Sequence, residues 1–194
     1  SLALSALAAG DTVGCEATVT DGYGGTDTAS ASTEAANSCS SATFNGLGDR
    51  IVIVQDEAFD TTVFTATFWA NVVGSQSGHL LVKGDNATTE WSFTHNPIPE
   101  GVYFNHQNVR NLIATQLPFG EWFHAAATYD GSQATLYING AWAGSETFSF
   151  TPSPSSLIIG NISNCWDCSI LGNMAHVAFF DEVLSESEIN DLSE

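Results

Sequence analysis

The sequence predicts an all-β protein built from two antiparallel sheets, because of its turns, its alternation and its composition. Asp130-Gly131 and Asn139-Gly140 each stand between short runs of β-forming residues, which is the sequence pattern of a β-hairpin. Between residues 64 and 72, apolar and polar side chains alternate as they do in a strand with one buried face. The chain has 194 residues, 43% of them apolar, so it can fill a sizeable core.

The first 39 residues differ from the rest and predict a separate β-hairpin. Residues 11–20 and 26–35 have the composition of strands, and residues 21–25 form a glycine-rich turn between them. A lone hairpin buries too little surface to be stable by itself, so this one needs another sheet to join. We therefore divide the chain into an appendage, residues 1–39, and a domain, residues 40–194.

From residue 41 onward, strands and turns follow one another at close spacing, which indicates a sandwich of two sheets. Strands are expected at residues 42–44, 50–54, 63–73, 79–83, 89–95, 102–106, 110–115, 122–129, 133–138, 142–148, 157–160 and 174–180. If residues 96–101 form a hairpin loop, His95 lies opposite His106 and Trp91 lies opposite Arg110. The chain closes with a short helix, which Ser185 and Glu188 open as a capping box.

The charge balance excludes some partners. There are 22 acidic residues against three Lys and Arg, for a formal net charge of −19. Such a surface repels phosphate backbones and anionic lipid headgroups, so nucleic acid and direct membrane insertion are not expected. A saline solvent, which screens the self-repulsion, explains this charge better than a dedicated cation function does.

Four cysteines form an even set, with three pairings open: Cys15, Cys39, Cys165 and Cys168. Sequence order suggests Cys15 with Cys39 and Cys165 with Cys168. The C-x-x-C pair lacks the βαβ surroundings of a redox motif and a second pair for zinc, so structural disulfides are expected. Disulfides, and a first residue that is not Met, favour an extracellular or cell-surface protein cut from a longer chain.

Residues 41–194 resemble the laminin-G-like, concanavalin A-like jelly-roll superfamily in the order and spacing of several motifs. The matching residues are Phe44, Gly46, Asp49, Ile51 and Ile53; Thr65 and Trp69; Trp122, His124, Ala126, 128–131 and 136–140; Leu157, Ile159 and Gly160; and Gly172, Met174, Val177, Phe180, Leu184, Ser185, Glu188 and Ile189. The resemblance implies a jelly roll in which Trp69 and Trp122 are core residues. Lectins, adhesion modules and glycosidases all share this fold, so the resemblance does not select a function.

The appendage, residues 1–39, resembles the last two strands of the immunoglobulin-like or cadherin-like repeats of bacterial surface proteins. The matching residues are Gly10, Asp11, Cys15, 19–22 and 28–32. The resemblance implies that the earlier strands of such a repeat are missing. A neighbouring subunit could complete the sheet by adding strands to it.

The jelly-roll resemblance also implies a calcium site on the rim of the sandwich. Carried over by position, Asn45 and Asp49 remain, whereas the closing-strand aspartate falls at Ala175. Calcium takes six to eight oxygen ligands, so Asn45, Asp49 and Asp181 would need backbone carbonyls and water beside them.

The sequence lacks the usual catalytic motifs, which favours binding over catalysis. No strand carries the paired carboxylates of a glycosidase, and no nucleophile elbow or H-E-x-x-H helix occurs, so we expect no enzyme. Sugar binding needs an aromatic platform beside hydrogen-bonding side chains. The candidate ligand-binding residues are Trp91, His95, Asn105, His106, Trp142 and Trp166.

Two functions follow as hypotheses. The first is a secreted, non-catalytic jelly-roll module that binds glycans or a cell-surface protein. The second is a structural subunit of an extracellular filament or sheath, assembled with copies of itself by strand complementation through residues 1–38.

Overall fold

The computed structural model describes residues 12–20 and 26–34 as backbone strands, and then residues 41–73, 77–84, 89–97, 100–106, 109–113, 117, 120–161 and 168–194. The chain divides into two units, Ser1–Ser40 and Ser41–Glu194, and each is described by itself. In the first unit, β1 (Thr12–Thr20) and β2 (Thr26–Glu34) pair in antiparallel fashion over their full lengths. The predicted N-terminal hairpin is therefore present.

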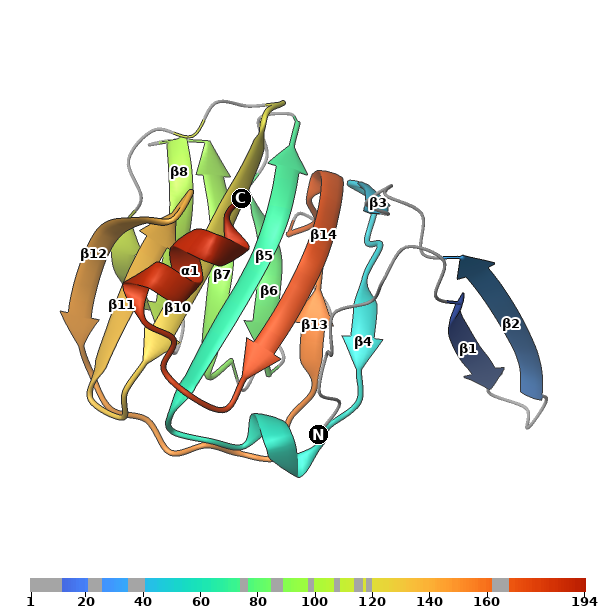
Figure 1. The fold of residues 1–194 in the computed structure, drawn as a ribbon, viewed down its shortest axis with the longest axis horizontal. Helices are drawn as coiled ribbons and strands as arrows, with labels where there is room; N and C mark the ends of the chain where they lie inside the picture. The colour runs from blue at the N-terminus through green and yellow to red at the C-terminus, as the bar shows by residue number, and fades with distance from the viewer. Residues whose placement is uncertain are drawn as a thin grey trace. The chain divides into compact units, whose positions relative to one another are not determined.

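The second unit is a sandwich of two six-stranded antiparallel sheets, which confirms the predicted fold class (Figure 1). The front sheet has the order β12-β11-β10-β5-β14-β3 and the back sheet the order β4-β13-β6-β7-β8-β9. The front strands are β3 (Ala42–Asn45), β5 (Phe64–Val72), β10 (Trp122–Tyr129), β11 (Gln133–Ile138), β12 (Ala141–Thr147) and β14 (Leu171–Phe180). The back strands are β4 (Ile51–Ile53), β6 (Gly78–Lys83), β7 (Trp91–Pro97), β8 (Glu100–His106), β9 (Val109–Ile113) and β13 (Leu157–Ile159).

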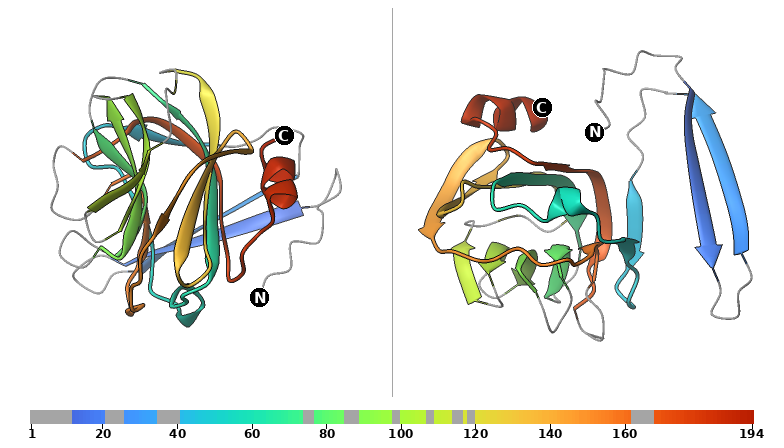
Figure 2. Two further views of the ribbon diagram at one scale, coloured as in Figure 1. Left: turned by 90° about the vertical axis from the view of Figure 1, so that its left-hand side faces the viewer. Right: turned by 90° about the horizontal axis from the view of Figure 1, so that it is seen from below.

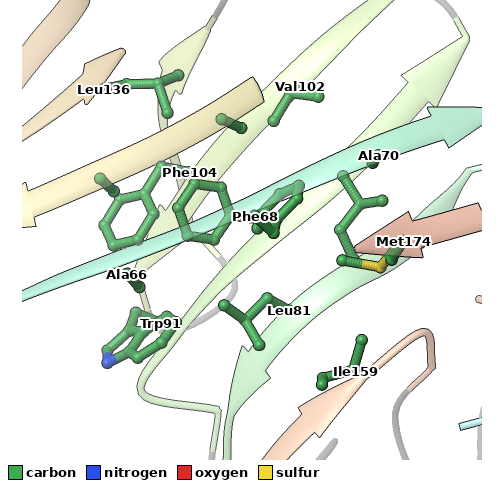
Figure 3. Packing of buried hydrophobic residues seen from close by; sticks show 14 of the residues in the cluster. Ala66, Phe68, Ala70, Leu81, Trp91, Val102, Phe104, Leu136, Ile159 and Met174 are labelled. Atoms are coloured by element: carbon green, nitrogen blue, oxygen red, sulfur yellow. The ribbon is translucent and has the colours of Figure 1, made fainter. Parts of the chain in front are cut away.

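The core fills the space between the sheets and is rich in aromatic side chains. The predicted alternation in β5 is confirmed, since Phe64, Ala66, Phe68 and Ala70 are buried in the core on the inner face. Phe64 stacks on Trp91 of the back sheet with ring centroids 5.0 Å apart. Figure 3 shows the inner side chains of the two sheets meeting in this way.

Two predicted turns appear with the backbone that their sequences favour. Asn139 and Gly140 both have positive φ, 50° and 76°, as a type I′ hairpin turn requires. At Asp130-Gly131, the Asp130 carboxylate accepts the backbone N–H groups of Ser132 and Gln133 at 2.8 and 2.7 Å. These bonds lower the pKa of Asp130.

The C-terminal helix covers part of the front sheet from outside, as Figure 2 shows from two further directions. Helix α1 (Glu186–Leu192) begins with the predicted capping box, in which Ser185 and Glu188 exchange hydrogen bonds. Its fully buried Ile189 packs near Ala126 and Leu184. A short 3-10 helix, η1 (Glu57–Phe59), precedes β5. Among the described residues, no helix is both long enough and apolar enough to cross a membrane.

The predicted register of the β7–β8 hairpin is wrong. Asn96 pairs with Gly101, so the two strands extend through most of the expected loop, and only residues 98–99 lie between them. His95 therefore lies opposite Val102, and Trp91 lies opposite His106. The prolines suggested a long loop, but Pro97 ends β7, where a missing N–H breaks no bond in the middle of the ladder.

Candidate functional site

The β7–β8 residues expected to bind ligand do not form an exposed surface. Trp91 is 1% exposed and belongs to the aromatic core, so it cannot serve as a platform for a sugar. His95 and Asn105 are also buried, and the Asn105 amide donates to the Thr94 hydroxyl at 2.8 Å. His106 is half-buried and stacks on Phe148 at 4.3 Å, and burial lowers its pKa. The assignment of Trp91, His95, Asn105 and His106 to one binding face is corrected accordingly.

A small cavity of about 180 Å³ lies beside the β6–β7 pair. Polar side chains line much of it: Ser77, His79, Thr94, His95 and Asn96, with Cys168 at its edge. Burial lowers the pKa of His79, and its bond to the Cys168 carbonyl opposes that shift only in part. The volume is below the roughly 300–1,000 Å³ of an ordinary small-molecule site, and none of the described residues that line the cavity is a Trp, Tyr or Phe.

The three expected calcium ligands do not come together. Asn45 lies opposite Leu171, the first residue of β14, whereas Asp181 follows the last residue of that strand. Ten residues of strand separate the two ends by roughly 30 Å. Asn45 and Asp49 do lie in one turn, but there Asp49 accepts the Asn45 N–H at 3.0 Å and Asn45 accepts the Leu47 N–H at 2.7 Å. Among the described residues, no three acidic, His or Cys side chains gather as metal ligands do.

The disulfide predictions are only partly within the described structure. Cys168 is disulfide-bonded. Cys165 and Cys39 lie outside the described residues, and β1 gives only the backbone of Cys15. The pairings Cys15–Cys39 and Cys165–Cys168 therefore stay predictions.

A buried cluster of charged side chains links the two sheets at one end of the sandwich. Lys83 is fully buried and donates to Asp60 at 2.8 Å and to the carbonyls of Ser153 and Ser155 at 3.3 and 2.7 Å. Glu90 accepts both serine hydroxyls at 2.7 and 2.9 Å. The bond to Lys83 holds the pKa of Asp60 below its usual value. Both carboxylates are thus engaged in holding the chain together.

Of the two tryptophans that are exposed in the described structure, one is a predicted ligand-binding candidate and the other is not. Trp142 is 62% exposed, in line with its selection as a candidate, and its indole N–H donates to the Ser145 hydroxyl at 3.1 Å. Trp166 lies outside the described residues. Trp122, expected in the core, is 44% exposed on the outer face of the front sheet, so that expectation is wrong.

Trp122 begins a row of polar side chains that crosses the front sheet. Trp122 lies opposite Asn71, Asn71 opposite Asn173, and Asn173 opposite Thr43. Directly opposed residues in antiparallel strands share a face, so these four residues, here called the Trp122 row, form a band about 14 Å long. The helix leaves the ends of β5 and β14 that carry this row uncovered (Figure 1).

The hydrogen bonds of the Trp122 row leave groups available to a ligand. The Asn71 amide donates to the Gly120 carbonyl at 3.0 Å and its Oδ1 is buried, so Asn71 supports the row without offering an acceptor to a ligand. Thr43 donates to Asn173 Oδ1 at 2.8 Å, which leaves the Asn173 amide nitrogen and the Thr43 lone pairs open. The row therefore offers an indole face with both donors and acceptors beside it.

A buried histidine supports the neighbouring row of the same face. His124 lies opposite Trp69, is 1% exposed and hydrogen-bonds to Thr67. The Trp69 indole donates to the Leu192 carbonyl at 3.3 Å, so the end of α1 is fastened here. Burial lowers the pKa of His124 to about 4, so this ring is neutral at pH 7.

The sequence contained a signal for Trp122 but none for its partners. Alternation in β10 places Phe123, Ala125 and Ala127 on one face, and these three belong to the core between the sheets, so Trp122 belongs to the other face. Asn71, Asn173 and Thr43 come from strands far apart in the chain, and only the strand order shows that they are neighbours.

Comparison with known proteins supports the fold. The native heptameric SAP-like pentraxin of Limulus polyphemus is similar with a TM-score of 0.67 and 12% identity, over 79% of this chain and 81% of that one. Domain 4 of AbnA, an extracellular arabinanase of Geobacillus stearothermophilus solved with arabinotriose, gives 0.60 and 17%, over 95% and 88%. The Trypanosoma rangeli sialidase gives 0.64 and 16%, over 79% of this chain but only 27% of its own.

No curated protein sequence matches this chain. The family described as the concanavalin A-like lectin/glucanases superfamily, Laminin_G_3, matches residues 45–190. The matched segment covers most of the chain and nearly all of the jelly roll. The chain therefore belongs to the Laminin_G_3 family of concanavalin A-like domains.

Proposed function

We propose that this domain is a secreted, non-catalytic module that binds glycans through the Trp122 row. The observation that carries the proposal is a 44%-exposed indole at one end of a line of amide and hydroxyl groups on the outer face of the front sheet. Sugars present apolar C–H faces and rings of hydroxyls, which match an aromatic face and mixed donors and acceptors. The row extends past a single side chain, so it suits an oligosaccharide.

The relatives and the cysteine chemistry support parts of this proposal. Domain 4 of the arabinanase was solved with a bound oligosaccharide, arabinotriose, and it aligns with nearly its whole length. A disulfide at Cys168 suits an oxidising, extracellular setting. The absence of catalysis is proposed because Asp60 and Glu90, which share one buried cluster, are held by Lys83, Ser153 and Ser155.

Replacing Trp122 by Ala is expected to weaken glycan binding about tenfold. The loss of one stacked aromatic platform corresponds to about 1.4 kcal/mol. A glycan array identifies the ligand, with and without calcium because the family resemblance implies that cation, and isothermal titration calorimetry then compares the variants.

Trp142→Ala is the matched control, since Trp142 is also exposed but lies outside the row. It should bind like the unchanged protein. Loss of binding in Trp142→Ala with none in Trp122→Ala would move the site to β12. Binding of no glycan under either condition would refute the proposed function.

A second candidate function, a subunit that assembles through residues 1–38, is favoured by one observation. Among the strands that the structure describes, β1 and β2 pair only with each other. A two-stranded sheet is marginal alone and gains stability by joining another sheet.

Deleting residues 1–38 is expected to leave the jelly roll folded and to abolish any polymer of the full-length chain. Negative-stain electron microscopy and sedimentation of both forms test this, with circular dichroism as the control for folding. Polymers that persist after the deletion, or a full-length chain that stays monomeric, would contradict this second function.

A further inference from the structure

We infer that the Trp122 row selects uncharged glycans and discriminates against sialylated, uronic-acid-containing or sulfated ones. This inference rests on the proposed function and adds the chemical class of its ligand. Its basis is the placement of charge in the two sheets.

The front sheet and the helix on it contain no cationic Lys or Arg. The three such residues of the whole chain are Arg50, Lys83 and Arg110. Arg50 directly precedes β4, Lys83 ends β6 and Arg110 belongs to β9, and all three strands are in the back sheet. None of the strands that contribute to the Trp122 row therefore contributes a positive side chain.

Lys83 is not available to bind an anion from outside the protein. It is 0% exposed, and Asp60 with the carbonyls of Ser153 and Ser155 takes up its three N–H donors. His124 comes from the same strand face as Trp122, but it is buried, and its low pKa keeps the ring neutral near pH 7.

Both ends of the Trp122 row lie beside acidic residues. Glu121 is exposed and directly precedes Trp122. At the other end, Thr43 is two residues before Asn45, whose N–H the Asp49 carboxylate accepts. The helix on this face adds Glu186, Glu188 and Asp191. The sheet face that carries the row therefore has carboxylates near both ends of the row and on its helix, and no Lys or Arg.

This placement of charge makes the row less favourable for anionic sugars than for neutral ones. A carboxylate or sulfate placed here would lose water without gaining a cation, and it would be repelled by the flanking carboxylates. Sugar hydroxyl groups suit the row better, because the Asn173 amide nitrogen can donate to them and the Thr43 hydroxyl can accept from them without any charge. The row therefore accepts neutral sugars and penalises anionic ones.

The test uses pairs of ligands in which one member carries an added anionic group, such as lactose with sialyllactose and a neutral galactan with its sulfated form. Binding of the full-length protein is measured on a glycan array and by calorimetry at 50 and 500 mM NaCl. We expect the neutral member to bind about tenfold more tightly, with a gap that narrows at high salt. Tighter binding of the anionic members would overturn the inference and leave glycan binding intact. Binding of neither member of any pair would refute the proposed function and this inference with it.

A charge-insertion variant gives a second test. Thr43 is exposed at the end of the Trp122 row, so Thr43→Lys should strengthen binding of the anionic ligands about two- to fivefold. Val54→Lys is the matched control, since Val54 is 75% exposed and follows β4 of the back sheet. An equal gain in both variants would show that net charge, and not the row, sets the selectivity, which would also overturn the inference.

Discussion

Replacing Lys83 by Met is expected to lower the free energy of unfolding by about 3–5 kcal/mol. The Lys83 side chain is fully buried, and its ammonium group serves Asp60 and two backbone carbonyls at once. Met preserves much of the volume, so the loss reports the missing charge and hydrogen bonds more than a cavity. Urea unfolding followed by tryptophan fluorescence measures the effect.

The size of this effect follows from what Lys83 connects. Residues 148–156 carry the chain from β12 of the front sheet to β13 of the back sheet. Lys83 holds this crossing at Ser153 and Ser155, and Glu90 holds the same two serines through their hydroxyls. Without the ammonium group, the Ser153 and Ser155 carbonyls and the Asp60 carboxylate each lose a hydrogen bond from a buried donor.

A double-mutant cycle separates the ion pair from the rest of the cluster. Asp60→Asn alone leaves the Lys83 charge without its partner, so it should also destabilise the protein. In Lys83→Met with Asp60→Asn, the combined loss should be smaller than the sum by about 1–3 kcal/mol, because the two groups are in direct contact. A Lys83→Met loss under about 1 kcal/mol, or strict additivity, would show that the buried pair does not hold this crossing.

Much of the fold could be predicted because its signals are local. Asn139-Gly140 sets its turn by the backbone that these two residues tolerate, and Ser185 with Glu188 caps a helix from within one turn. Alternation in β5 identified the buried face for the same reason, since neighbouring residues of a strand point to opposite sides.

The candidate site could not be predicted, because its residues are neighbours only across strands. The order β10-β5-β14-β3 joins strands that are not consecutive in the chain, and the Trp122 row exists only once that order is known. The family resemblance also misplaced Trp122, since a motif shows that a residue recurs but not which face it occupies. At Trp91 the prediction failed in the opposite direction, because a buried residue was predicted to be an exposed ligand platform. Trp91 and Phe93 alternate along β7 and share its inner face, where both belong to the core.

Lowering the pH from 6.5 to about 4 is expected to reduce the free energy of unfolding by about 3 kcal/mol through His124 alone. In the folded protein burial lowers the pKa of this ring to about 4, whereas in the unfolded chain it keeps its ordinary value of 6.5. Above pH 6.5 the ring is neutral in both states, so the contribution is fully present there. Between pH 6.5 and 4 only the unfolded chain takes up the proton, so stability falls by about 1.4 kcal/mol per pH unit. His79 and His106, whose pKa values are also lowered by burial, act in the same direction.

The lowered pKa of His124 has its physical cause in the surroundings of the ring, beside Trp69 and the end of α1. The Nδ1 atom of His124 is buried with no hydrogen-bond partner among the described residues, so a proton added to the ring would bring a charge that nothing neutralises.

Urea unfolding at half-unit steps of pH tests this, with His124→Gln expected to flatten the dependence of the unfolding free energy on pH between pH 4.5 and 6.5. His176→Gln, at an exposed residue of β14, is the control for the loss of a histidine as such. The carboxylates with lowered pKa, Asp60, Asp130 and Glu188, lose their own contributions as the pH falls below their ordinary values of 3.8 to 4.5, so they add to the loss only at the acid end of this window. An unchanged slope in His124→Gln would show that another group carries the pH dependence. Because His124 follows Trp122 by two residues on the same strand face, the same protonation should also weaken glycan binding below pH 5.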